Sequence, residues 1–105
     1  MPNKEDLKAY LSHHIGAARG ISVEQLADAL LTDARHVRHL VTELRMDGVA
    51  VCATPSEGYF IAETHEELER TLNNLRSRAM RSLVLESQLR HVPLPELLGQ
   101  LRLKT

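Results

Sequence analysis

The chain has 105 residues, a formal net charge of -1 and a single cysteine. This length suits one small core, and a lone cysteine excludes an intramolecular disulfide and a thiolate metal cluster. The first ten residues are too charged for a signal peptide, and no apolar run approaches the roughly 18 residues of a membrane span. A cytoplasmic protein without a membrane segment is therefore expected.

The composition favours helices, because eighteen leucines stand against three aromatic residues and β-rich domains rely more on valine, isoleucine and aromatics. Charge is distributed unevenly: residues 1–63 hold six Lys/Arg and nine Asp/Glu, and residues 64–105 hold seven and five. The two parts thus carry -3 and +2. Nucleic-acid binding usually needs a strongly basic surface. Any DNA-binding role must therefore depend on where individual cations lie.

Two helices are predicted in the first part of the chain. The first is expected over 4–15 from apolar residues at helical spacing. The second is expected over about 23–31, because Ser22 and Gln25 form a capping-box pattern at its start. The apolar positions of these helices are Leu7, Tyr10, Leu11, Ile15, Val23, Leu26, Ala27 and Leu30.

A third helix and a β-hairpin are predicted next. Asp33 is placed to cap a helix over 34–47 that ends at Gly48, and two five-residue runs rich in β-formers, 49–53 and 58–62, flank the turn sequence T-P-S-E. The apolar positions of the third helix have i, i+3, i+4, i+7 spacing, which predicts one buried face. They are Val37, Leu40, Val41 and Leu44.

Residues 64–105 are predicted to form a helical extension. Thr64 and Glu67 make a second capping box, and no proline or glycine interrupts a long helix over about 64–91. The apolar face shifts near residue 84, which predicts a break or a change of packing partner there. A short helix is expected over about 95–101, after Pro95. One face of the long helix carries Leu68, Leu72, Leu75, Ala79 and Leu83.

Residues 21–62, about 42 of the 105, resemble the winged helix-turn-helix DNA-binding domain of the biotin-repressor type. The shared motifs are a Leu-Ala pair in the second helix, L-R-x-x-G-x-x-V after the third, and a wing ending in Gly-Tyr. In this chain they are Leu26-Ala27, Leu44-Arg45, Gly48, Val51 and Gly58-Tyr59.

The resemblance implies a mainly α fold with a small β-hairpin: a winged helix-turn-helix in residues 1–63, followed by a long C-terminal helix. The part beyond Thr64 is similar to small winged-helix proteins of phages and prophages. Two positions depart from the family. Leu31 stands where glycine often ends the second helix, so a differently built turn is expected, and Glu57 stands where the wing often carries a basic residue.

The outward face of the third helix is the candidate DNA interface. At 100° per residue, with the apolar face turned inward, three arginines gather on the opposite arc. In a helix-turn-helix this arc enters the major groove, where Arg binds guanine; an ordinary solvated polar face is the alternative. Arg19 is a candidate for a contact to the phosphate backbone, and Ser56 in the wing 54–58 is a candidate for a contact at the minor groove. The helix candidates are Arg35, Arg38, His39, Thr42 and Arg45.

Neither a metal site nor an active site is expected. His36 and His39 lie one helical turn apart but supply only half of a tetrahedral zinc site. Cys52 fits a small buried apolar thiol better than a nucleophile, because no orienting group or oxyanion loop accompanies it. No cofactor is therefore expected, and the protein is not expected to be an enzyme.

Sequence-specific binding of double-stranded DNA by a homodimeric phage-type regulator is the function that these patterns and the resemblance favour. The apolar face from Leu68 to Leu83 would be the dimerisation element, unless the first helix covers it. The alternative is a winged-helix interaction module that binds a host or phage protein in replication or anti-defence, which the acidic first part and Glu57 favour. The operator, the direction of regulation and any effector are not determined by the sequence.

Overall fold

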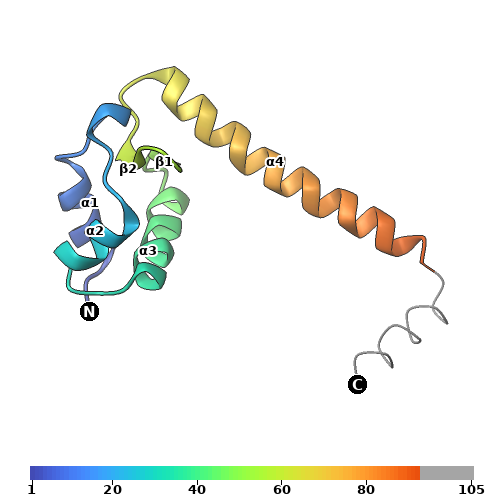
Figure 1. The fold of residues 1–105 in the computed structure, drawn as a ribbon, viewed down its shortest axis with the longest axis horizontal. Helices are drawn as coiled ribbons and strands as arrows, with labels where there is room; N and C mark the ends of the chain where they lie inside the picture. The colour runs from blue at the N-terminus through green and yellow to red at the C-terminus, as the bar shows by residue number, and fades with distance from the viewer. Residues whose placement is uncertain (93–105) are drawn as a thin grey trace. The chain divides into compact units, whose positions relative to one another are not determined.

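The computed structural model describes residues 1–92, which form four α-helices, one short 3-10 helix and one two-stranded antiparallel hairpin (Figure 1). The predicted fold class, mainly helical with a small β-hairpin and a long C-terminal helix, is confirmed. The short helix predicted over 95–101 lies outside the described residues. In chain order the elements are α1 (Lys4–Leu11), η1 (Ala17–Arg19), α2 (Val23–Ala29), α3 (Ala34–Met46), β1 (Val51–Thr54), β2 (Gly58–Ile61) and α4 (His65–Arg90).

The chain divides into two compact units, of which Met1–Leu72 is here called the head and the second begins at Asn73. The head contains α1 to α3, the hairpin and the first turns of α4. Within the head, α2 and α1 both pack against α3. α4 is one continuous helix to Arg90. Of the two alternatives predicted near residue 84, the break is therefore wrong, and a change of packing partner stays a prediction.

Side-chain caps fix where the helices begin. The predicted capping box of α2 is present, with Gln25 N–H donating to Ser22 Oγ at 3.1 Å and Ser22 N–H donating to Gln25 Oε1 at 3.3 Å. Asp33 caps α3 by accepting the N–H three residues ahead at 2.8 Å. A third capping box, between Asn3 and Asp6, begins α1 and was not predicted. These caps satisfy backbone donors that have no partner inside a helix.

The first helix ends earlier than predicted, at Leu11 instead of Ile15. Ile61 N–H donates to the carbonyl of His14 at 2.9 Å, and Gly16 N–H donates to the carbonyl of Ile61 at 2.8 Å. These two hydrogen bonds form a short parallel bridge between Ile15 and Ile61 of β2. The helical spacing of Ile15 was therefore misleading, because pairing with the hairpin satisfies the local backbone groups instead of a further helical turn.

The core lies between the helices and one face of the hairpin. The four apolar positions predicted for α3 are all buried, each no more than 2% exposed. Tyr10 is only partly buried, at the edge of this core. The other buried members of this core are Leu7, Leu11, Ile21, Leu26, Ala27 and Val51. Cys52 and Phe60 pair across the hairpin and are buried on its other face, because successive side chains of a strand point to opposite sides.

The segment before α2 pairs with β2 through backbone hydrogen bonds between Ile21 and Tyr59. Val51 pairs with Ile61 and Thr54 with Gly58, so both strands are slightly offset from the predicted runs. Ile21 N–H donates to the carbonyl of Tyr59 at 2.9 Å, and Tyr59 N–H donates back at 2.7 Å. A Cβ atom on Gly58 would collide with the backbone of Ile21. Glycine is required there because another backbone passes so close.

Candidate functional site

The turn between α2 and α3 spans the four residues 30–33, which suits a helix-turn-helix. Thr32 N–H donates to the carbonyl of Ala27 at 2.9 Å, and Leu31 N–H donates to that of Asp28 at 3.2 Å. This pattern is a Schellman motif, which normally has glycine at its left-handed position. Leu31 takes that position with φ of 54°, the one positive φ among the non-glycine residues of 1–92. The turn therefore has the usual geometry despite the departure in sequence.

The outward face of α3 carries Arg35, Arg38, His39 and Thr42, all exposed. Thr42 Oγ1 donates to the carbonyl of Arg38 at 3.1 Å, and His39 Nε2 lies 3.1 Å from a carboxylate oxygen of Glu43. Within residues 1–92, neither guanidinium group of Arg35 and Arg38 makes a hydrogen bond or an ion pair. Their donors therefore point to solvent from a helix whose opposite face is buried.

Arg45 differs from the other two arginines of α3. It is half-buried, and its Nε donates to the carbonyl of Val51 at 2.8 Å. This bond ties the end of α3 to the start of β1. One of its five N–H donors is thus committed to the fold, and the exposed arginine pair consists of Arg35 and Arg38.

The tip of the hairpin and the segment before α2 lie against each other. A Cβ atom on Gly20 would collide with the carbonyl oxygen of Glu57, so the two backbones are in direct contact. The exposed side chains of Arg19 and Ser56 therefore come from neighbouring segments at one edge of the head. The ring of His14 holds the Arg19 carbonyl through Nδ1 at 2.7 Å, which fixes this segment.

Glu57 turns away from the hairpin tip, toward α4. Its carboxylate is 29% exposed, and Oε1 lies 4.0 Å from Nη1 of Arg70. Its N–H donates to Thr54 Oγ1 at 3.0 Å, and its Oε2 is buried without a hydrogen-bond partner in residues 1–92. Sequence reasoning missed Arg70, because no periodic spacing relates a turn residue to a helix 13 positions later. The acid at the hairpin tip thus faces a cation.

Comparisons of this chain with protein-family models, with curated proteins and with solved structures find no match. No helix in residues 1–92 is long and apolar enough to cross a membrane.

Glu67 joins the start of α4 to the η1 segment. Its carboxylate accepts the N–H groups of Ala17 at 2.8 Å, Glu63 at 2.8 Å and Thr64 at 3.2 Å. These hydrogen bonds lower the pKa of Glu67. The bond from Ala17 has the largest effect, and the bond from Glu63 has the second largest. The capping box with Thr64 was predicted and is confirmed, whereas the bond to Ala17 could not be predicted because it spans 50 residues.

His36 and Cys52 both contact backbone carbonyl groups of the fold. His36 Nε2 contacts the carbonyl of Pro2 at 2.8 Å, and its ring centroid lies 6.3 Å from that of His39. In the described part of the chain, no three His, Cys, Asp or Glu side chains are grouped so that they could hold a metal ion. Cys52 is fully buried, as predicted, with Sγ 3.7 Å from the carbonyl of Glu67.

The predicted dimerisation face of α4 is largely uncovered in the single chain. Leu68 is half-buried, but Leu72, Leu75, Ala79 and Leu83 are exposed. Further along α4, other large apolar side chains are 51–64% exposed, a pattern that indicates an interaction surface. They are Met80, Val84, Leu85 and Leu89.

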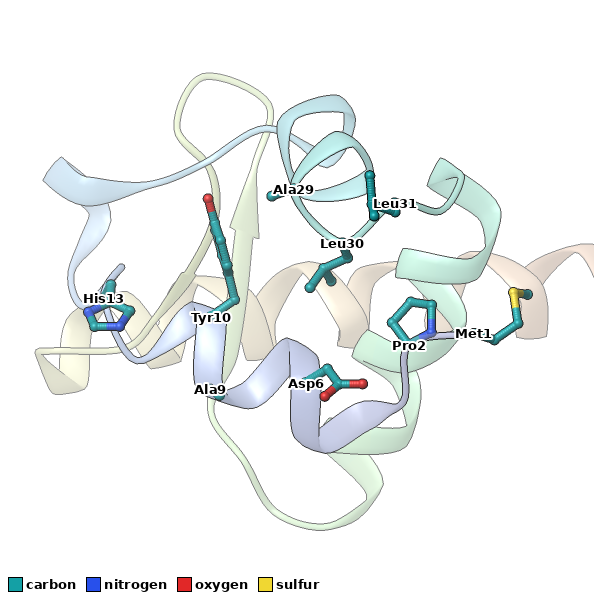
Figure 2. A pocket seen from close by; sticks show the side chains of 9 residues that line it. All are labelled: Met1, Pro2, Asp6, Ala9, Tyr10, His13, Ala29, Leu30 and Leu31. Carbon is teal, nitrogen blue, oxygen red and sulfur yellow. The ribbon is translucent and has the colours of Figure 1, made fainter.

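A shallow apolar hollow of about 870 Å³ lies between α1 and the end of α2 (Figure 2). One face of α1 supplies Asp6, Ala9 and Tyr10, and the turn after α1 supplies His13. The side chains of Tyr10 and Leu30 lie between the two helices. The rim carries the other members of the lining: Met1, Pro2, Ala29 and Leu31. Leu31 is 91% exposed, although its backbone geometry would favour glycine.

Proposed function

We propose that this chain is a winged helix-turn-helix protein that binds double-stranded DNA at specific sequences, acting as a homodimeric regulator of the phage or prophage type. The observation that carries the proposal is the exposed pair Arg35 and Arg38 on α3, which has no partner within residues 1–92. It stands on the second helix of a helix-turn-helix unit with a four-residue turn. The sequence resemblance over residues 21–62 supports the same assignment.

In this proposal α3 lies in the major groove. Arg35 and Arg38 are one helical turn apart, so they reach neighbouring base pairs, where a guanidinium can donate two hydrogen bonds to guanine O6 and N7. His39 and Thr42 flank them on the same face and suit phosphate or thymine-methyl contacts. Arg45 contributes its remaining donors near the hairpin. The N-terminal turn of α3 adds backbone N–H groups that favour phosphate.

The wing edge supplies contacts to the DNA backbone in this proposal. Arg19 and Ser56 stand on neighbouring segments, and phosphate contacts of this kind position a protein without reading sequence. The pairing of Glu57 with Arg70 reduces the repulsion that a bare carboxylate would exert on phosphate. The wing is therefore compatible with DNA despite its acid.

Replacing both exposed arginines of α3 tests the proposal. Arg35→Ala with Arg38→Ala should weaken binding to the preferred sequence by at least about 30-fold, because each bidentate contact to a base contributes about 1–3 kcal/mol. The preferred sequence comes from selection out of a random DNA library, and affinity is followed by fluorescence anisotropy across a salt series.

The matched control removes two exposed cations elsewhere, Lys8→Ala with Arg90→Ala, and should change only the salt-dependent, non-specific part of the affinity. Equal loss in both double variants would mean that α3 reads no bases. Failure of the wild-type chain to enrich any sequence would reject DNA recognition.

The alternative function, a module that binds a host or phage protein, is favoured by the apolar hollow of Figure 2 and by exposed Leu31 at its rim. It predicts no DNA retention at low salt and a stoichiometric protein partner. Leu31→Asp should abolish capture of that partner, whereas Arg35→Ala should leave it unchanged.

A further inference from the structure

The charges of α4 are separated along its length. Acids occupy its first turns, at Glu66, Glu67 and Glu69, and arginines occupy its middle. Between Arg70 and Glu86 the helix has no acidic residue. The arginines of the middle are Arg76, Arg78 and Arg81, all exposed.

This separation matters because the apolar face runs between the charged groups. At 100° per residue, Leu68, Leu72, Leu75 and Ala79 fall within an arc of roughly 60°. Glu69 and Arg76 lie seven residues apart, so both flank this arc on the same edge. The side chain of Glu69 is 49% exposed and its nearest partner is the exposed His65 at 3.5 Å, so its carboxylate is free for a stronger contact.

The two ways of pairing this helix with a copy of itself differ in which edges meet. Each helix has two edges, one on either side of its apolar arc. In an antiparallel pair related by a two-fold axis, an edge lies beside the same edge of the other copy. In a parallel pair, it lies beside the opposite edge of the other copy. In the parallel pair, the edge of Glu69 meets the edge of Thr71 and Arg78. Acids then lie level with acids and arginines with arginines, which repels the two copies.

In the antiparallel pair the charges are complementary. When Leu72 of one copy lies beside Leu75 of the other, Leu68 falls level with Ala79 and Glu69 comes within reach of Arg76. The two-fold axis produces each of these contacts twice. The basic middle of each helix then faces the acidic beginning of the other.

We propose that the occupant of the exposed apolar face of α4 is α4 of a second copy, running antiparallel and centred between Leu72 and Leu75, with Glu69 paired to Arg76 across the interface. The proposal rests on the homodimer of the proposed function and adds its orientation and register. It does not depend on DNA binding.

Charge exchange tests the pairing in the full-length chain. Glu69→Arg and Arg76→Glu should each raise the dimer dissociation constant about tenfold, because each places two like-charge contacts where two exposed ion pairs stood. The double exchange should return it to within about threefold of wild type. Sedimentation over a concentration series measures the constant, and circular dichroism checks that each variant is folded. A double variant as weak as the weaker single variant would overturn the pairing.

A distance measurement tests the orientation independently. A spin label on Ser87→Cys in each copy should give a separation of about 40 Å in the antiparallel pair and less than about 20 Å in a parallel one, from the helical rise and interaxial spacing. Cys52 is fully buried and does not compete for the label. The short distance would overturn the orientation alone, whereas a monomeric wild-type chain would overturn the homodimer as well; neither outcome bears on DNA recognition by α3.

Discussion

The head and the part of α4 beyond Asn73 use the same residue type for different purposes. Leucines in the head are mostly buried, as Leu7, Leu11, Leu26 and Leu44 all are. Leucines of α4 from Leu75 to Leu89 are 41–64% exposed. A leucine in the head therefore stabilises the chain it belongs to, whereas a leucine in distal α4 is available to another molecule.

The difference arises from spacing and surroundings. The apolar residues of α3 occupy one face, and α1, α2 and the first strand of the hairpin pack against α3. In α4 beyond residue 79, apolar side chains occur on several sides of the helix. A single neighbour cannot cover all of them, and a helix that is apolar all round is usually buried by several neighbours.

Replacing one leucine by alanine in each of the two regions should give the largest difference between them. Leu40→Ala removes a side chain that is 2% exposed and should lower the free energy of unfolding by about 2–5 kcal/mol. Leu85→Ala, at an exposed position, should change it by no more than about 0.5 kcal/mol. Urea denaturation of dilute protein measures both. Similar losses would mean that the distal helix is covered within the same chain.

Two left-handed helix ends in the head give a smaller effect of predictable sign. Gly48 has φ of 85°, and a Cβ atom there would meet no neighbouring atom. Gly48→Ala should therefore lower the free energy of unfolding by about 1 kcal/mol, through backbone strain alone. Leu31→Gly should raise it by about 0.5 kcal/mol, because the strain it relieves exceeds the entropy cost of glycine. Thermal unfolding measures both. Destabilisation by Leu31→Gly would show that Leu31 makes a contact that its exposure conceals.

The smallest effect expected is on the pH dependence. Since the pKa of Glu67 is lowered in the folded chain, its contribution is present above the unfolded pKa, near 4.3, and is lost as pH falls through the folded pKa. Glu67→Gln should therefore destabilise the head at neutral pH, with the difference from wild type shrinking in acid. Glu86→Gln, which removes only the exposed pair with Arg90, is the matched control. A pH-independent difference would assign the effect of Glu67→Gln to geometry alone.

Local signals predicted much of the head correctly. The caps at Ser22, Asp33 and Thr64 and the buried face of α3 follow from neighbours within four residues, so the order of the amino acids is enough to indicate them. Ile15 was misassigned to a helix because its pairing partner lies more than forty residues away. For the same reason, the hydrogen bond from Ala17 to Glu67 and the turning of Glu57 toward Arg70 carry no sequence signal.

The candidate site divides in the same way. Helical periodicity placed Arg35, Arg38, His39 and Thr42 on one outward face, and all four are exposed. Periodicity placed Arg45 with them, but its hydrogen bond to Val51 depends on how the hairpin packs against α3. The proximity of Arg19 and Ser56 likewise depends on contact between two loops.

By itself, the sequence determined the order of the elements, where most helices begin and which face of α3 is buried, because periodicity and capping act over one or two helical turns. The tertiary structure decided which charged groups are used by the fold and which stay free. It paired Glu57 with Arg70, bound Arg45 and Glu67 to distant backbone atoms, and left Arg35 and Arg38 without partners in residues 1–92. These contacts join segments far apart in the chain, so only the packed molecule specifies them.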